Sequence, residues 1–264
     1  MGTSKGYKMP SGGEWGPLKR EATDFAQNVG IKPMAPQPLL THYIRVRGNS
    51  GGGSSTGGGD GGGQRESGAT EGGAGRGRGG AWRAGVCTAH KLGGFLSRVG
   101  EVGLAETLRE TGLGDLVGRP ASEISLALLD ELAGPASTLD QAAAREALVE
   151  LNDDLLAEAE TFDDVEVALA KVLDQGGVFE ILLRFFGHYL YSCFCRDFYE
   201  RLLKRVGESR AAQSLKSIKD CIQSAVKAKL TGHDPKKFNW RGADGKKLSE
   251  QVLAEILDIY EVSG

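Results

Sequence analysis

The sequence predicts an all-α protein: a single multi-helix domain around one long buried central helix, preceded by a flexible glycine-rich N-terminal region. From residue 81 onward apolar residues recur at helical spacing, and no segment of useful length alternates apolar and polar residues as a strand does. Residues 178–206 contain a single glycine and are apolar nearly all round, which is typical of a buried helix. At 1.5 Å per residue this helix would span roughly 40 Å, the width of a small domain.

Glycine is distributed unevenly and divides the chain into three predicted parts. Residues 1–47 form an N-terminal tail with short helical segments, residues 48–80 form a disordered linker, and residues 81–264 form the all-helical domain. About half of residues 48–80 are glycine, and that composition is typical of a flexible coil that cannot build a packed core.

Two short helices are predicted before the linker, at residues 18–28 and 39–46. Neither is long enough to be stable alone, so we expect both to dock on the rest of the protein if they are ordered. After the linker, a helix at residues 82–98 is expected to be interrupted at Gly93–Gly94, and a short amphipathic helix follows at residues 102–110.

Capping signals place the helices that follow. Ser122, which comes after a proline, is predicted to cap a helix that ends at Gly134. Either Thr138 or Asp140 is predicted to cap the next helix, which runs to about residue 159.

A capping box is predicted at the start of the helix that precedes the central one. Thr161 and Asp164 have the required spacing, and the Gly176–Gly177 pair separates their helix from the central one. Amphipathic helices are then predicted at residues 208–230 and 247–260.

Charges are arranged in a pattern that the net charge of −3 conceals. Residues 101–174 are strongly acidic and residues 196–247 are basic, so the two regions either attract each other or offer patches to partners. Along the central helix, three oppositely charged pairs four residues apart are expected to form: Glu180 with Arg184, Arg196 with Glu200, and Asp197 with Arg201.

The composition indicates a cytoplasmic protein with no membrane segment. No uncharged run approaches the ~20 residues of a membrane span, and no secretory leader opens the chain. The four cysteines lack the spacing of a disulfide framework, which favours a compartment where thiols stay reduced.

Motifs of enzyme chemistry are missing from the sequence, which contains no phosphate-binding loop, nucleophile elbow or paired zinc ligands. Cys193 and Cys195 point to opposite sides of a helix and are interpreted as core residues. Asp154 and Glu158 share a helix face, interpreted as a solvated one. We therefore predict no catalytic residue, no metal site and no cofactor, and a protein that is not an enzyme.

An arginine–glycine tract closes the linker and is followed by an aromatic residue. Arg76, Arg78, Trp82 and Arg83 could contact single-stranded nucleic acid, with the ring stacking on a base. The alternative is that the tract only solubilises the linker, because its basic residues are few. A nucleic-acid-binding adaptor that uses this tract and the basic C-terminal region is the second function we consider.

The N-terminus carries a chemically usable amine. Met1 is normally removed when a small residue such as Gly2 follows, which would leave a glycine α-amine whose ordinary pKa is about 7.7–8.0. Gly6 stands where a myristoylation signal needs serine or threonine. Such an amine suits nucleophilic attack in a reaction catalysed by another protein.

A family resemblance begins at the N-terminal motif, which comprises Gly2, Thr3, Ser4, Gly6 and Tyr7, followed by Pro10. Past the linker it continues through LGGFL (92–96), residues 103–124, GPASTLD (134–140), the aromatic stretch 185–202 and WRGA (240–243). Together these segments resemble the QatB family of the bacterial four-gene Qat anti-phage system.

The resemblance implies partners as well as a fold. Qat systems pair this component with an ATPase, a QueC-like enzyme and a TatD-like DNase. QueC enzymes activate a deazaguanine carboxylate with ATP so that an amine can attack it. The resemblance therefore implies that Gly2 is joined to a deazaguanine-type base by the QueC-like partner, while the helical domain acts as an adaptor.

Overall fold

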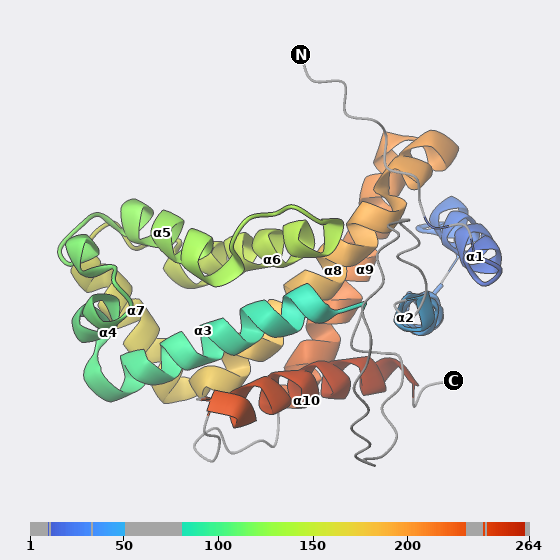
Figure 1. Cartoon of the computed structure of the whole chain (residues 1–264). Helices are drawn as coiled ribbons and strands as arrows, with labels where there is room; N and C mark the ends of the chain where they lie inside the picture. The colour runs from blue at the N-terminus through green and yellow to red at the C-terminus, as the bar shows by residue number, and fades with distance from the viewer. Residues whose placement is uncertain are drawn as a thin grey trace, which may run out of the picture.

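The computed structural model describes residues 10, 12–32, 34–50, 81–230, 240 and 242–261. That part of the chain contains ten α-helices, one short 3₁₀ helix and no strand, which confirms the all-α class (Figure 1). In chain order the elements are α1 (Trp15–Asn28), α2 (Gln37–Ser50), α3 (Arg83–Val102), α4 (Leu104–Glu110), η1 (Gly114–Leu116), α5 (Ala121–Ala133), α6 (Leu139–Leu156), α7 (Phe162–Gln175), α8 (Gly177–Val206), α9 (Glu208–Leu230) and α10 (Gly242–Glu261). None of these helices is long and apolar enough to cross a membrane.

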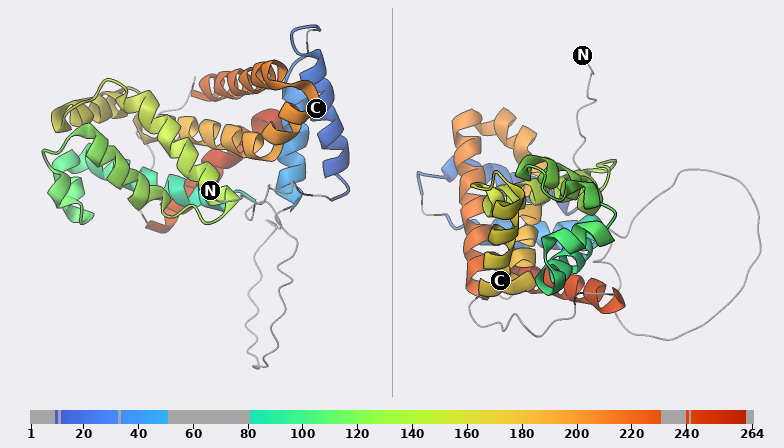
Figure 2. Two further views of the ribbon diagram at one scale, coloured as in Figure 1. Left: turned by 90° about the horizontal axis from the view of Figure 1, so that it is seen from above. Right: turned by 90° about the vertical axis from the view of Figure 1, so that its left-hand side faces the viewer.

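The long helix α8 lies at the centre of the fold, as predicted. It is buried along most of its length and contacts α1, α3, α6, α7, α9 and α10. The views in Figure 2 show α9 running beside α8, with α5, α6 and α7 toward one end of the molecule and α1 and α2 at the other. A helix covered on so many sides needs apolar residues around its whole circumference, and this explains the sequence pattern.

Helices α1 and α2 are stabilised by docking, as expected of short segments. Trp15 of α1 packs against Tyr43 of α2 and Phe198 of α8, with ring centroids 6.5 Å apart in both pairs. Both helices belong to the same continuous core as α8. Helix α2 extends to Ser50, so the predicted linker is helical at its first residues; its remainder, residues 51–80, lies outside the described residues. The three-part division of the chain stays a prediction.

Helix α3 is continuous through Gly93–Gly94, so the predicted interruption is wrong. A methyl group at Gly93 would come within 3.3 Å of both Leu182 and Trp240. The glycine therefore permits a close approach of neighbouring elements, and their packing outweighs its poor helix propensity.

Two of the predicted caps are present and one is not. Thr138 and Thr161 each form a complete capping box, with Gln141 and Asp164 respectively. Ser122 is not a cap, because α5 begins at Ala121 and Ser122 is its second residue; Pro120 is the N-cap residue, and no side chain caps the helix.

The caps lead to a first prediction. Replacing Thr161 with alanine should lower the free energy of unfolding by about 1 kcal/mol, because the backbone N–H of Asp164 loses its acceptor. Ser122→Ala is the matched control and should change it by less than about 0.5 kcal/mol, because Ser122 is exposed inside the first turn. Urea unfolding monitored by circular dichroism compares the two, and an equal loss in both would contradict the assignment.

Only one of the three charge pairs predicted on the central helix forms. Glu180 bonds Arg184, whereas Arg196 pairs with Glu146 of α6 at 3.0 Å. Asp197 is buried and points away from solvent. Tertiary partners therefore replace the local ones that the helical spacing indicated.

The last helix begins at Gly242, five residues before the predicted position. Its C-terminal end lies against α2, where Gln37 Nε2 donates a hydrogen bond to the carbonyl of Ile259 at 3.4 Å. The N-terminal helix pair therefore packs on both α8 and α10.

Candidate functional site

The predicted site residues divide between the described and the remaining part of the chain. The N-terminal motif (Gly2, Thr3, Ser4, Gly6 and Tyr7) and the linker arginines Arg76 and Arg78 lie outside the described residues. Along the chain, the first described residue after the N-terminal motif is Pro10, and the first after the linker arginines is Ala81.

Trp82 cannot stack on a nucleic-acid base, because its side chain is only 1% exposed. The indole packs edge-on against Tyr43 and Tyr189, and the guanidinium of Arg47 lies 4.9 Å from its centroid. Arg83 is exposed at the start of α3. Burial of Trp82 therefore removes the aromatic residue from the set of residues predicted to contact nucleic acid.

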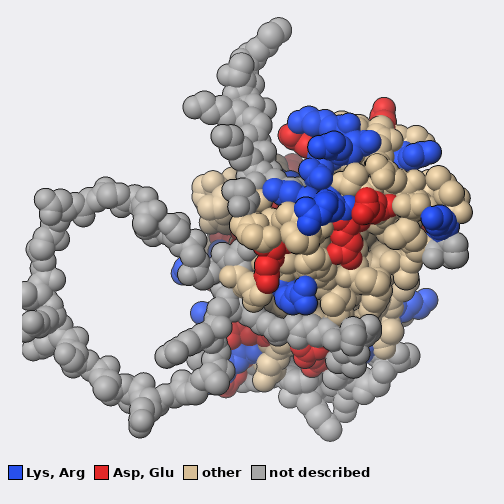
Figure 3. Space-filling model, turned by 90° about the vertical axis from the view of Figure 1, so that its right-hand side faces the viewer, with Lys and Arg blue, Asp and Glu red and all other residues tan. Residues whose placement is uncertain are grey.

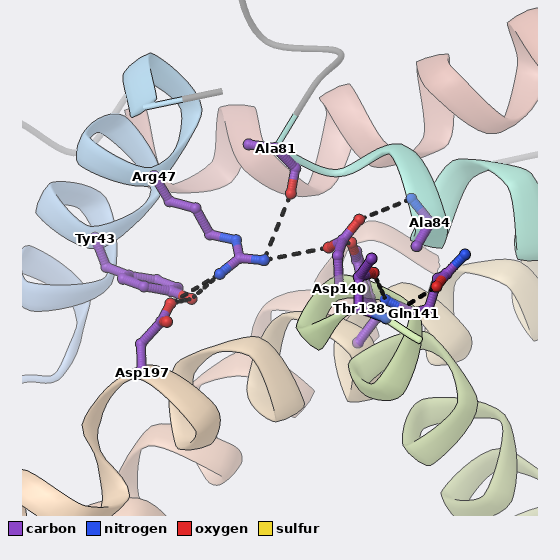
Figure 4. Close-up of polar contacts among 9 residues, drawn as sticks. Tyr43, Arg47, Ala81, Ala84, Thr138, Asp140, Gln141 and Asp197 are labelled. Atoms are coloured by element: carbon purple, nitrogen blue, oxygen red, sulfur yellow. Dashed lines mark hydrogen bonds and ion pairs between the residues drawn. The ribbon is translucent and has the colours of Figure 1, made fainter. Parts of the chain in front are cut away.

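A buried polar cluster in the described part is centred on Arg47 (Figure 4). The Arg47 guanidinium donates from Nη1 to Asp197 Oδ2 at 2.8 Å and from Nη2 to Asp140 Oδ1 at 3.2 Å. The Tyr43 hydroxyl donates to the same Asp197 oxygen at 2.8 Å. The cluster joins α2, α6 and α8.

The same cluster reaches the entry of α3. Arg47 Nη2 also donates to the carbonyl of Ala81 at 3.5 Å, and Asp140 accepts the backbone N–H of Ala84 at 2.8 Å (Figure 4). The Tyr189 hydroxyl donates to Asp140 as well. Since Arg47 lies three residues before Ser50, the cluster holds together the two described ends that flank residues 51–80.

Its electrostatics suit a structural tie. Burial raises the pKa of Tyr43 and Tyr189 well above the ordinary value, so both remain hydroxyl donors at neutral pH. Asp197 is 5% exposed, and its negative charge is balanced by Arg47 and the Tyr43 hydroxyl. Charges that are buried and mutually paired bind one another and offer nothing to a substrate.

The cysteines of α8 behave as core residues. Burial raises the pKa of Cys193 to about 12 and that of Cys195 to about 11, so both stay protonated and weakly nucleophilic at neutral pH. Among the described residues, no three His, Cys, Asp or Glu side chains are placed to hold a metal ion.

His188 and Asp154 form a pair that sequence reasoning missed. His188 Nε2 lies 2.7 Å from Asp154 Oδ2, so Asp154 is not simply solvated. The imidazole is 6% exposed and the carboxylate 47% exposed. The contact between the two side chains ties α6 to α8.

Two signals in the sequence could have indicated the Arg47 cluster. Asp197 sits between buried aromatic residues at a core register of α8, and an acidic residue there requires a partner. Asp140 was one of two candidate caps, and because Thr138 takes that role, Asp140 is free to bond Arg47.

The base of the N-terminal tail lies on a basic surface. Lys19 Nζ donates a hydrogen bond to the carbonyl of Pro10 at 2.7 Å. Lys19 also lines a groove of about 300 Å³ with residues of the C-terminal part of α8: Arg196, Asp197, Glu200, Arg201, Lys204 and Arg205.

The described part is therefore an all-helical scaffold in which the charged groups of the Arg47 cluster bind one another. The family model described as "Qat anti-phage system associated protein QatB" matches residues 73–260, and the chain belongs to the QatB family. It is accordingly a component of the Qat anti-phage defence system and is associated with other proteins of that system. No curated protein and no solved structure matches the chain.

Proposed function

We propose that this QatB-family protein is a non-catalytic adaptor of the cytoplasmic Qat system and that its N-terminal glycine is the substrate of a modification. The QueC-like enzyme of the system is the modifying partner, and the helical domain binds this enzyme or the ATPase. Assembly with the TatD-like DNase would follow from the same scaffold.

The observation that carries the proposal is the Met1–Gly2 start, eight residues before Pro10, where the chain contacts α1. A terminal glycine amine has no side chain to hinder attack, and part of it is neutral at cellular pH. The charged groups of the Arg47 cluster bind one another, which agrees with a protein that serves as substrate rather than catalyst.

The chemistry is an acyl transfer. The partner activates the carboxylate of the deazaguanine with ATP, which releases pyrophosphate. The Gly2 nitrogen then attacks the activated carbonyl carbon, an amide bond forms, adenylate leaves, and the amine loses a proton to solvent.

Intact-mass measurement of the protein co-expressed with its system tests the proposal. We expect a Met-free chain with the added mass of the acylating base, and no addition in Gly2→Pro, whose amine is secondary and hindered. Gly2→Ala is the matched control, because it keeps a primary amine on a small residue and should still accept the group, although more slowly.

A Met-free, unmodified mass in cells with active defence would exclude Gly2 as the substrate. Loss of defence in Gly2→Pro is interpretable only if the variant unfolds at the same urea concentration as the unsubstituted protein. We expect that result, because Gly2 precedes the first described element by thirteen residues.

A further inference from the structure

The groove between α1 and the end of α8 holds positive charge that the described part does not neutralise. Arg201 is half-buried and donates from Nε to the carbonyl of Lys19 at 3.1 Å and to the Thr23 hydroxyl at 3.2 Å. No carboxylate among the described residues lies within ion-pair distance of Arg201 or Arg205. Burial, and then the charge of Arg205, lowers the pKa of Arg201.

The acidic residues of this groove are already engaged. Asp197 is bonded by Arg47 and Tyr43, and Glu200 pairs with Lys204 at 3.3 Å. Figure 3 shows Lys and Arg side chains gathered on the upper part of this face, where α8 meets α9. The surface is therefore complementary to an acidic partner.

Chain length limits what can lie over this groove. Gly2 lies eight positions before Pro10, so the Gly2 amine reaches at most about 27 Å from Pro10. A 100-residue domain has a radius of gyration of about 13 Å, so an enzyme whose active site is within that reach can lie directly on the surface around Pro10. Lys19, which contacts Pro10, is part of the groove.

We propose that the basic groove formed by Lys19, Arg201, Lys204 and Arg205 is the docking surface for an acidic face of the enzyme that modifies Gly2. This inference rests on the proposed function. The groove positions the enzyme over the tail, and the tail supplies the nucleophile. Recognition is thereby separated from chemistry, which explains how a short tail can be modified selectively.

A charge-reversed variant, Lys204→Glu with Arg205→Glu, tests the docking surface. Both residues are exposed, and the contacts of Arg201 with α1 stay intact. Lys171→Glu with Lys227→Glu is the matched control, because it makes the same charge change at exposed positions of α7 and of the C-terminal half of α9.

The readout is the initial rate of Gly2 modification by the purified partner, measured by intact mass at low salt. We expect the charge-reversed variant to be modified about tenfold more slowly than the control, since opposing charges at a rim mainly slow association. The difference should shrink at 0.5 M salt, where the charges are screened. Equal modification rates in the charge-reversed variant and the control would overturn the proposed docking surface. That holds also if the groove is found to bind a single-stranded oligonucleotide instead.

The two proposals fail in different ways. If the unsubstituted protein gains no mass, the modification itself is excluded. If the unsubstituted protein and both double variants are modified at one rate, Gly2 remains the substrate and only the groove is excluded.

Discussion

Replacing Arg47 with alanine should lower the free energy of unfolding by about 3–5 kcal/mol, the cost of breaking a buried ion pair by removing one partner. Asp197 and Asp140 would both lose their cationic partner, and the Asp197 side chain is only 3% exposed. Water cannot easily replace the lost guanidinium, so the carboxylates would be left with too few partners.

Arg45→Ala is the matched control for this variant. Arg45 lies on the same helix, is exposed, and should change the free energy of unfolding by less than about 0.5 kcal/mol when removed. Chemical unfolding monitored by far-ultraviolet circular dichroism compares the two variants. Similar losses for both would show that the cluster contributes no more than an ordinary surface residue.

The double variant Arg47→Met with Asp197→Asn separates the cost of burying the two charges from the energy of the ion pair between them. Removing both charges avoids leaving a buried aspartate without its ion pair to Arg47, so we expect the double variant to be less destabilised than the sum of the single variants predicts. Additive losses would indicate that the two side chains are not coupled, contrary to the 2.8 Å contact between them.

Gly85→Ala should destabilise the protein by about 1–3 kcal/mol, as overpacking of a dense core does. A methyl group at this position of α3 would lie 2.2 Å from a ring carbon of Tyr189. The Tyr189 ring is fully buried and its hydroxyl bonds Asp140, so the ring has little freedom to move aside. Displacing it would also disturb the Arg47 cluster.

Gly94→Ala, on the same helix, should have the opposite effect on the free energy of unfolding. No atom lies within 4 Å of the added methyl group, so only the gain in helix propensity remains. We expect the free energy of unfolding to rise by about 0.5–1 kcal/mol. Thermal unfolding distinguishes the two, and destabilisation by both substitutions would show that glycine is required along α3 for another reason.

The scaffold explains how a protein with so much glycine keeps one core. Arg47, which precedes residues 51–80, bonds Ala81 on the other side of that segment, and Asp140 bonds both Arg47 and Ala84. The helices before that segment therefore pack against α8 and α10 as parts of one core. Helices α4, α5 and α7 lie toward the end of the molecule opposite the C-terminal end of α8, where the basic groove is (Figure 1).

Local signals were sufficient for the helices and for some of their boundaries. The all-α class, the central helix and the caps at Thr138 and Thr161 follow from the spacing of apolar residues and from side chains a few positions apart. The predictions at Gly93–Gly94 and at Ser122 were wrong, because tertiary packing and the first turn of α5 decided those positions.

The candidate site followed from the sequence only in part. Gly2 was identified from its position after Met1 and from the family resemblance, and its modification stays a prediction. The burial of Trp82 was not foreseeable, since a tryptophan beside an arginine–glycine tract suits a binding segment as well as a core.

The sequence by itself determined the helical class, the order of the helices and the chemistry available at the N-terminus. Each of these depends on residues that are neighbours in the chain. Only the tertiary structure decided that Arg47 bonds Asp197, 150 positions away, and that Lys19 and Arg201 share one groove. The physical reason is that a side chain's partners depend on how helices pack, and helical periodicity contains no information about which helix faces which.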